Sequence, residues 1–193
     1  MEEGSFFDVV EGSVDKLHAS LVVIGTHGKK GLKQAIFGSH ILRLVQLLNI
    51  PSLVVQESSK WPEDGFDKVL FPLGSHSNFE MKIHQTGDLM NAKGHVDLYA
   101  VYKTATLDPE TKKNIERCIE YFKQKEVNYS LVEEDAQFFS VGYARQTLAY
   151  AQSNPVNLLS IMAQSGGDMK VFSNAEQQYH EHGTESSVKQ RQA

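Results

Sequence analysis

The sequence predicts an α/β fold built on a doubly wound parallel sheet. Short apolar runs of strand character alternate with segments of helical periodicity along most of the 193 residues. This alternation is typical of parallel sheets that carry helices on both faces. Residues 21–24 are apolar at every position, as expected for a strand that is buried on both faces.

The first 56 residues are expected to form two helices and two strands that contribute to a shared sheet. Phe6 and Phe7 precede the first helix, and the strand at 21–24 follows it. Ser39 is predicted as the N-cap of a second helix, which ends near Asn49. That helix has one apolar stripe, formed by Ile41, Leu44, Val45 and Leu48. The second strand is predicted over residues 51–56.

Residues 57–66 are predicted to be a linker, because turn formers and charges gather there between two apolar runs. A second unit is expected over residues 67–182, with a disordered tail at 183–193. Its strands are predicted at 68–73, 96–101, 127–132 and 157–162, and its helices at 78–93 (closed by Gly94), 109–125 and 141–152.

Residues 25–40 have the composition of a phosphate-binding loop. Glycines and lysines join the apolar strand to the second helix, with Gly38 directly before Ser39. A helix start leaves backbone N–H groups unpaired and carries partial positive charge, so it stabilises an anion without a dedicated side chain. A glycine lets the anion approach the backbone closely. Neither a G-x-x-x-x-G-K-[ST] sequence nor a G-x-G-x-x-G after a strand occurs.

The spacing Gly25-x-x-Gly28, nine residues, then Gly38-Ser39 resembles the nucleotide-binding signature of the universal stress proteins. The resemblance implies a Rossmann-like sheet of the adenine nucleotide α-hydrolase-like type and a role in stress response. It also implies that ATP or AMP, with or without Mg²⁺, is the ligand. The residues that it implies at the nucleotide are Gly25, Thr26, His27, Gly28, Gly38, Ser39 and His40.

The resemblance further implies a tandem arrangement. Residues 1–56 correspond to the C-terminal half of a first domain, which leaves about 70 residues of a full unit missing. The missing half would contribute most of the adenine and ribose pocket. Residues 67–182 correspond to a degenerate second domain: Met162, Ser165 and Ser173 stand where the glycines are expected, and Leu73 to Ser75 lack the family's Asp. We expect this copy to be a structural partner.

Composition excludes several function classes. A net charge of −5 argues against a nucleic-acid partner, and no apolar run approaches the ~20 residues of a membrane span. The acidic N-terminus lacks the layout of a signal peptide, so a cytoplasmic location is expected. The single cysteine, Cys118, excludes an internal disulfide and is predicted to be a buried structural thiol.

Three functions remain open: a regulatory module that binds ATP or AMP, a nucleotide-free interaction scaffold, and a weak ATP hydrolase. The third needs a carboxylate that holds Mg²⁺, and residues 25–40 contain neither Asp nor Glu. No catalytic residue is predicted. His180 and His182 are interpreted as part of a solvated tail, without a metal site. We expect domains to pair within the chain or as a homodimer, with Ser52 to Gln56 as a candidate pairing edge.

Overall fold

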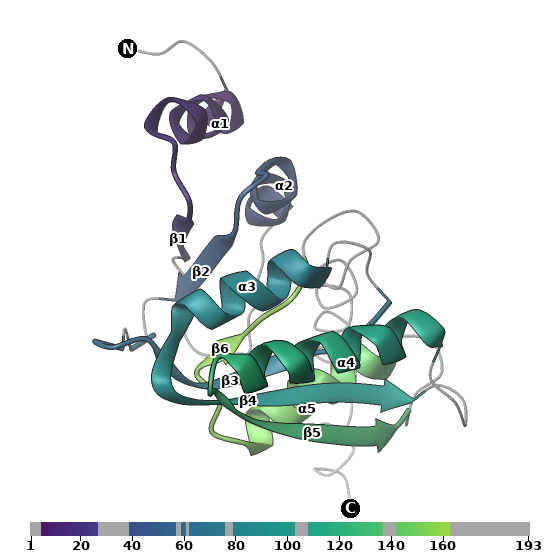
Figure 1. Cartoon of the computed structure of the whole chain (residues 1–193). Helices are drawn as coiled ribbons and strands as arrows, with labels where there is room; N and C mark the ends of the chain where they lie inside the picture. The colour runs from purple at the N-terminus through teal and green to yellow at the C-terminus, as the bar shows by residue number, and fades with distance from the viewer. Residues whose placement is uncertain are drawn as a thin grey trace, which may run out of the picture. The chain divides into compact units, whose positions relative to one another are not determined.

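The structure is a computed structural model that describes residues 5–26, 39–56, 59–60, 62–75, 79–102, 108–136 and 142–162. These residues fall into two compact units, 5–60 and 62–162 (Figure 1). Among the described helices, none has the length and apolar character that crossing a bilayer requires. The predicted tail and the histidines at 180 and 182 lie outside these ranges.

The first unit contains a parallel pair of strands and two helices. Its elements are α1 (Phe6–Leu17), β1 (Val22–Thr26), α2 (Ser39–Leu47) and β2 (Ser52–Gln56). The two strands run in register, from Val22 opposite Ser52 to Thr26 opposite Gln56. The predicted apolar stripe of α2 is confirmed, since Leu44, Val45 and Leu48 are buried together with Leu53 of β2.

The start of α1 is fixed by a capping box. The Ser5 hydroxyl accepts a hydrogen bond from the Asp8 amide at 3.4 Å, and the Asp8 carboxylate accepts one from the Ser5 amide at 3.0 Å. The helix ends where His18 adopts a left-handed conformation, with φ of 49°. Phe6 and Phe7 therefore belong to the first turn of α1 and do not precede the helix.

The second unit is a four-stranded, fully parallel sheet in the order β5-β4-β3-β6. The α/β class with parallel sheets is thus confirmed. Helices α3 and α4 lie on one face of this sheet and α5 lies on the other (Figure 1). The elements are β3 (Phe66–Pro72), α3 (Phe79–Leu89), β4 (Met90–Tyr102), α4 (Pro109–Gln124), β5 (Asn128–Asp135), α5 (Gly142–Ser153) and β6 (Leu158–Leu159).

The face of this sheet under α3 and α4 is apolar. The Phe71 ring meets Phe79 of α3 and Phe122 of α4 at centroid distances of 5.5 and 6.2 Å. Cys118 of α4 is fully buried in the same layer, and burial raises the pKa of its thiol to about 12. The prediction of a buried thiol is confirmed.

Some predicted boundaries are wrong. The helix predicted over 78–93 ends at Leu89, and β4 begins at the next residue. Gly94 lies inside β4, where a Cβ would stand 2.9 Å from the carbonyl oxygens of both Asn91 and Phe66. Glycine is needed there for close backbone approach and not for helix termination.

Three further expectations differ from the structure. Ser39 is the first residue of helix α2 itself, whereas the sequence predicted it as the N-cap, the residue directly before the helix. The strands β1 and β2 form a two-stranded sheet of their own, so the described strands do not form the shared sheet that was expected. β3 begins at Phe66, within the segment predicted as a linker.

Candidate functional site

The candidate site lies where β1 ends and α2 begins. Gly25 and Thr26 are the last two residues of β1 and pair with Val55 and Gln56 at the end of β2. Because the strands are parallel, both carboxyl ends lie at one edge of the sheet, which is where α/β folds bind ligands. The chain enters α2 at Ser39.

Four of the seven predicted site residues lie in the described part of the chain. These are Gly25 and Thr26 in β1, and Ser39 and His40 at the start of α2. His27, Gly28 and Gly38 lie outside the described residues. The structure therefore describes the end of the strand and the start of the helix, and residues 27–38 between them lie outside the described ranges.

No contact or backbone dihedral angle among the described residues requires a glycine at position 25. A Cβ built on Gly25 meets no described atom within 4 Å, whereas Cβ atoms on Gly65, Gly87 and Gly94 all would stand closer than 3 Å to a neighbour. Gly25 is also not among the described residues with positive φ. Neither packing among the described residues nor backbone conformation thus explains the glycine.

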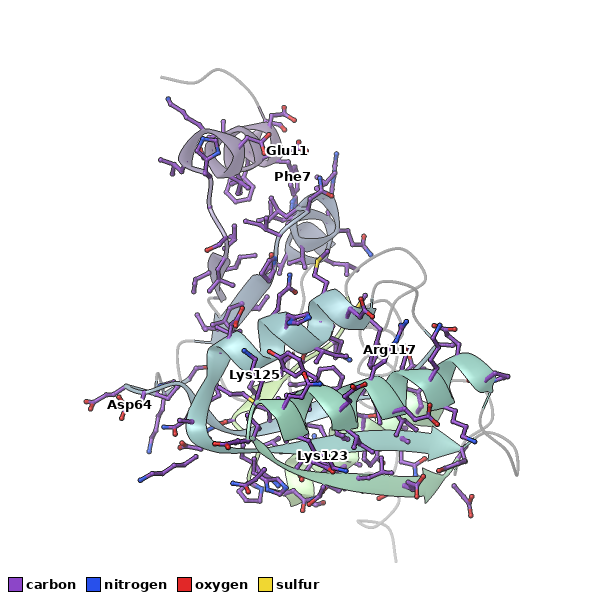
Figure 2. All side chains as sticks on the ribbon, viewed as in Figure 1. Phe7, Glu11, Asp64, Arg117, Lys123 and Lys125 are labelled. Carbon is purple, nitrogen blue, oxygen red and sulfur yellow. The ribbon has the colours of Figure 1, made fainter. Side chains whose placement is uncertain are left out.

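The first turn of α2 contacts α1 through an aromatic side chain. The Phe7 ring stacks on the His40 ring, with centroids 6.0 Å apart and planes 8° from parallel. The Arg43 guanidinium carbon lies 4.5 Å from the Phe7 centroid, a cation–π contact. Figure 2 labels Phe7. Sequence reasoning missed Phe7 and Arg43, because a stacking contact between two helices leaves no local sequence pattern.

The charges around this contact are modest. Hydrogen bonds from Ser5 hold the pKa of the Asp8 carboxyl below its usual value, and the nearby Arg43 cation adds a smaller lowering. His40 is exposed at the second position of α2. A helix start with an arginine one turn further on favours an anion.

The corresponding edge of the second unit contains a buried lysine. Lys82 of α3 donates a hydrogen bond from Nζ to the Pro72 carbonyl oxygen at 2.6 Å, and its ammonium lies 4.1 Å from the Phe71 centroid. The Thr86 and Ser160 hydroxyls are 2.7 Å apart beside it. This edge, between β3 and β6, is the point where strand order reverses, and the protein's own polar groups bond one another there.

The loop after β3 is also fixed by the protein. The Asn114 side-chain amide of α4 donates to the Gly74 carbonyl oxygen at 2.9 Å. Gly74 lies in the segment that lacks the expected Asp, whereas Ser165 and Ser173 lie outside the described residues. The edge of the second unit is therefore held together by side chains of α3 and α4.

The other face of the second sheet has a polar layer that sequence reasoning missed. Asp97 of β4 is buried and accepts hydrogen bonds from Lys68 Nζ at 2.6 Å and from the Tyr150 hydroxyl at 3.0 Å. Burial, followed by the bond to Asp97, raises the pKa of Tyr150 to about 12. Beside it, Glu134 accepts from the Tyr99 hydroxyl at 2.7 Å and from the Gln146 amide at 2.6 Å.

These polar groups bond one another and form part of the packing under α5. Burial, with the bond to Glu134, also raises the pKa of Tyr99. Within the described ranges, no three His, Cys, Asp or Glu side chains are grouped so as to hold a metal ion. The Tyr99 and Tyr150 hydroxyls are thus kept protonated as hydrogen-bond donors to carboxylates.

Comparison with known proteins gives a family match and a match to solved structures. Residues 2–56 match the universal stress protein family. A crystal structure of a functionally unknown protein from Pseudomonas aeruginosa PAO1 is similar over 90% of this chain, with a TM-score of 0.55 and 15% identity. The chain spans 65% of the length of that protein. No curated protein gives a significant match.

Proposed function

Because residues 2–56 match the universal stress protein family, we propose that the chain is a nucleotide-binding regulatory module of the stress response. ATP or AMP is the proposed ligand, with its phosphates between the end of β1 and the start of α2. The family match supports a module of the stress-response type. The nucleotide and its place in the chain are our proposals.

The observation that carries the proposal is that a Cβ at Gly25 would meet no described atom within 4 Å. Neither the described packing nor φ requires a glycine there, so we infer that a ligand approaches the backbone at the end of β1. Gly28 and Gly38 would give the same access, while Thr26 and His27 would flank the phosphates. The backbone N–H groups of Ser39 and His40 would then donate to phosphate oxygens.

We propose that the second unit is a structural partner without a nucleotide. The support is Lys82, whose ammonium already bonds the carbonyl of Pro72 at the edge where a ligand would enter. A ligand would have to displace a buried cation from a carbonyl oxygen and an aromatic ring, which costs free energy. Regulation would therefore arise from nucleotide binding in the first unit alone.

A nucleotide-free scaffold is the second candidate. It is favoured by the two-stranded sheet of the first unit, in which β2 pairs only with β1 among the described strands. In this candidate, the segment Ser52–Gln56 would pair with a second copy and form a homodimer. Weak ATP hydrolysis would need a carboxylate near the phosphates, and residues 25–40 contain none.

Calorimetric titration of the full chain separates the candidates. We expect saturable binding of ATP, competition by AMP, and no binding of GTP, with and without Mg²⁺. Release of inorganic phosphate is measured in parallel to detect hydrolysis. If neither ATP nor AMP binds at millimolar concentration, the nucleotide proposal is wrong and the scaffold is favoured. Steady release of phosphate would favour the hydrolase.

A further inference from the structure

Phe7 connects helix α1 of the first unit to α2. None of the residues of α1 is fully buried, and the Phe6 ring is 64% exposed and meets the Phe7 ring edge-on at a centroid distance of 5.7 Å. The Phe7 ring in turn meets both His40 and Arg43 of α2. The packing of α1 against α2 therefore includes a ring that contacts two residues near the start of α2.

The two residues that Phe7 contacts are three positions apart in a helix and so lie on the same face. His40 is the second residue of α2, and Arg43 is one turn further along. Long side chains on a helix lean toward its N-terminus, so Arg43 and His40 reach the same ring. Contact with Phe7 thus fixes the first turn of α2, which otherwise frays as helix ends do.

We propose that Phe7 is a positioning residue for the nucleotide site, which couples docking of α1 to the order of the first turn of α2. This inference rests on the proposed function, in which N–H groups of that turn donate to phosphate. Any ligand that needs the turn ordered binds more tightly when Phe7 already orders it. By reciprocity, the bound nucleotide strengthens docking of α1 by the same factor. Helix α1 is then the element through which binding is signalled.

The test compares Phe7→Leu with Phe6→Leu, the same substitution at the neighbouring, exposed ring. Hydrogen exchange is measured first on the full chain without nucleotide. We expect Phe7→Leu to speed exchange of the amides at 43–47, which bond carbonyls from the first turn onward, about fivefold, the scale of a lost aromatic and cation–π contact. Phe6→Leu should leave these rates unchanged. Phe7→Tyr keeps the ring, so it should restore the wild-type rates.

The second arm measures ATP affinity and the effect of ATP on α1. Phe7→Leu should raise the Kd for ATP about fivefold, in line with the exchange result, while Phe6→Leu and Phe7→Tyr should not. Saturating ATP should slow exchange in α1 of the wild type but not of Phe7→Leu.

Unchanged exchange at 43–47 in Phe7→Leu would overturn the positioning role, whether or not ATP binds. Faster exchange with an unchanged Kd would overturn the coupling. If the wild type binds no ATP, the proposed function fails and the coupling fails with it. The exchange arm then still decides whether Phe7 orders α2, so the two failures are distinguishable.

Discussion

Asp97 of β4 accepts a hydrogen bond from Lys68 of the neighbouring strand β3, with 2.6 Å between Oδ1 and Nζ. The Asp97 side chain is 4% exposed and that of Lys68 is 27% exposed. Tyr150 of α5 donates to the second oxygen of the same carboxylate. This single carboxylate thus links two strands and a helix.

Replacing this carboxylate should destabilise the second unit strongly. We expect Asp97→Ala to lower the free energy of unfolding by about 2–4 kcal/mol, because a partly buried ammonium and a hydroxyl lose their partner. Urea denaturation measures the change. Glu80→Ala is the matched control, since the Glu80 side chain is 66% exposed and 3.5 Å from Arg117. That surface pair should contribute less than about 0.5 kcal/mol, so an equal loss in both variants would contradict the assigned role of Asp97.

Alkaline pH should weaken the second unit through Cys118. Its pKa is raised from 9.0 to about 12 in the folded protein, so the folded state binds the thiol proton more tightly than the unfolded state does. This contribution to stability is fully present below pH 9 and is lost as pH rises from about 9 to about 12. The slope approaches about 1.4 kcal/mol per pH unit for this one group. Tyr150, whose pKa is raised to about 12, adds to the slope above pH 10.

Cys118→Ala removes the thiol and should flatten the dependence of unfolding free energy on pH between 9 and 12. Tyr150→Phe is a second control, which should flatten the curve only above about pH 10. In native protein at pH 8, we also expect the thiol to react with a disulfide reagent only after unfolding. Rapid labelling of folded protein would show that Cys118 is accessible, against the described burial.

Two glycines of the first unit form a matched pair, because a Cβ on either Gly12 or Gly25 meets no described atom within 4 Å. We expect both Gly12→Ala and Gly25→Ala to fold, each with about 0.5–1 kcal/mol of added stability. Gly25→Ala should weaken ATP binding about tenfold, since the methyl group occupies space that the ligand needs. Gly12→Ala in α1 should leave the Kd unchanged. Equal ATP affinity in both variants would remove Gly25 from the site.

Replacing Gly94 by alanine should destabilise the protein, in contrast to Gly12→Ala and Gly25→Ala. Because its Cβ would lie 2.9 Å from two backbone carbonyl oxygens, Gly94→Ala forces the starts of β3 and β4 apart. We expect a loss of at least about 2 kcal/mol in unfolding free energy, the range of strained backbone sites. Thermal unfolding of Gly94→Ala measures this loss of stability, with Gly12→Ala as the control. A Gly94→Ala variant as stable as the wild type would show that β4 begins later than Met90.

The order of elements could be predicted from sequence, but some boundaries and all of the polar layer could not. Apolar runs identify strands such as β3 and β4, whose central residues are buried. The run at 21–24 also forms a strand, but Val23 of β1 is 52% exposed, so the expectation that this strand is buried on both faces is wrong. Gly94 was misread as a helix end, since its requirement comes from the distant Phe66 backbone. Asp97 interrupts an apolar strand, and only the folded chain brings Lys68 and Tyr150 to it.

The glycines of the candidate site are proposed from the sequence, whereas the contacts around its helix start are seen only in the fold. Gly25, Ser39 and His40 belong to a local spacing that a family pattern contains. Phe7 and Arg43 come together only when α1 docks on α2, and no periodicity in either helix encodes that contact. Local chemistry is therefore readable from the sequence, while contacts between distant segments require the fold.

The most direct test of the account is an NMR titration of the full chain with ATP, which follows individual backbone amides. We predict saturable shifts at Gly25, Thr26, Ser39 and His40, with a common Kd, and no comparable shifts at Gly74 or Ser160 at the edge of the second unit. Shifts confined to the second unit, or none anywhere at millimolar ATP, would contradict a nucleotide site between β1 and α2.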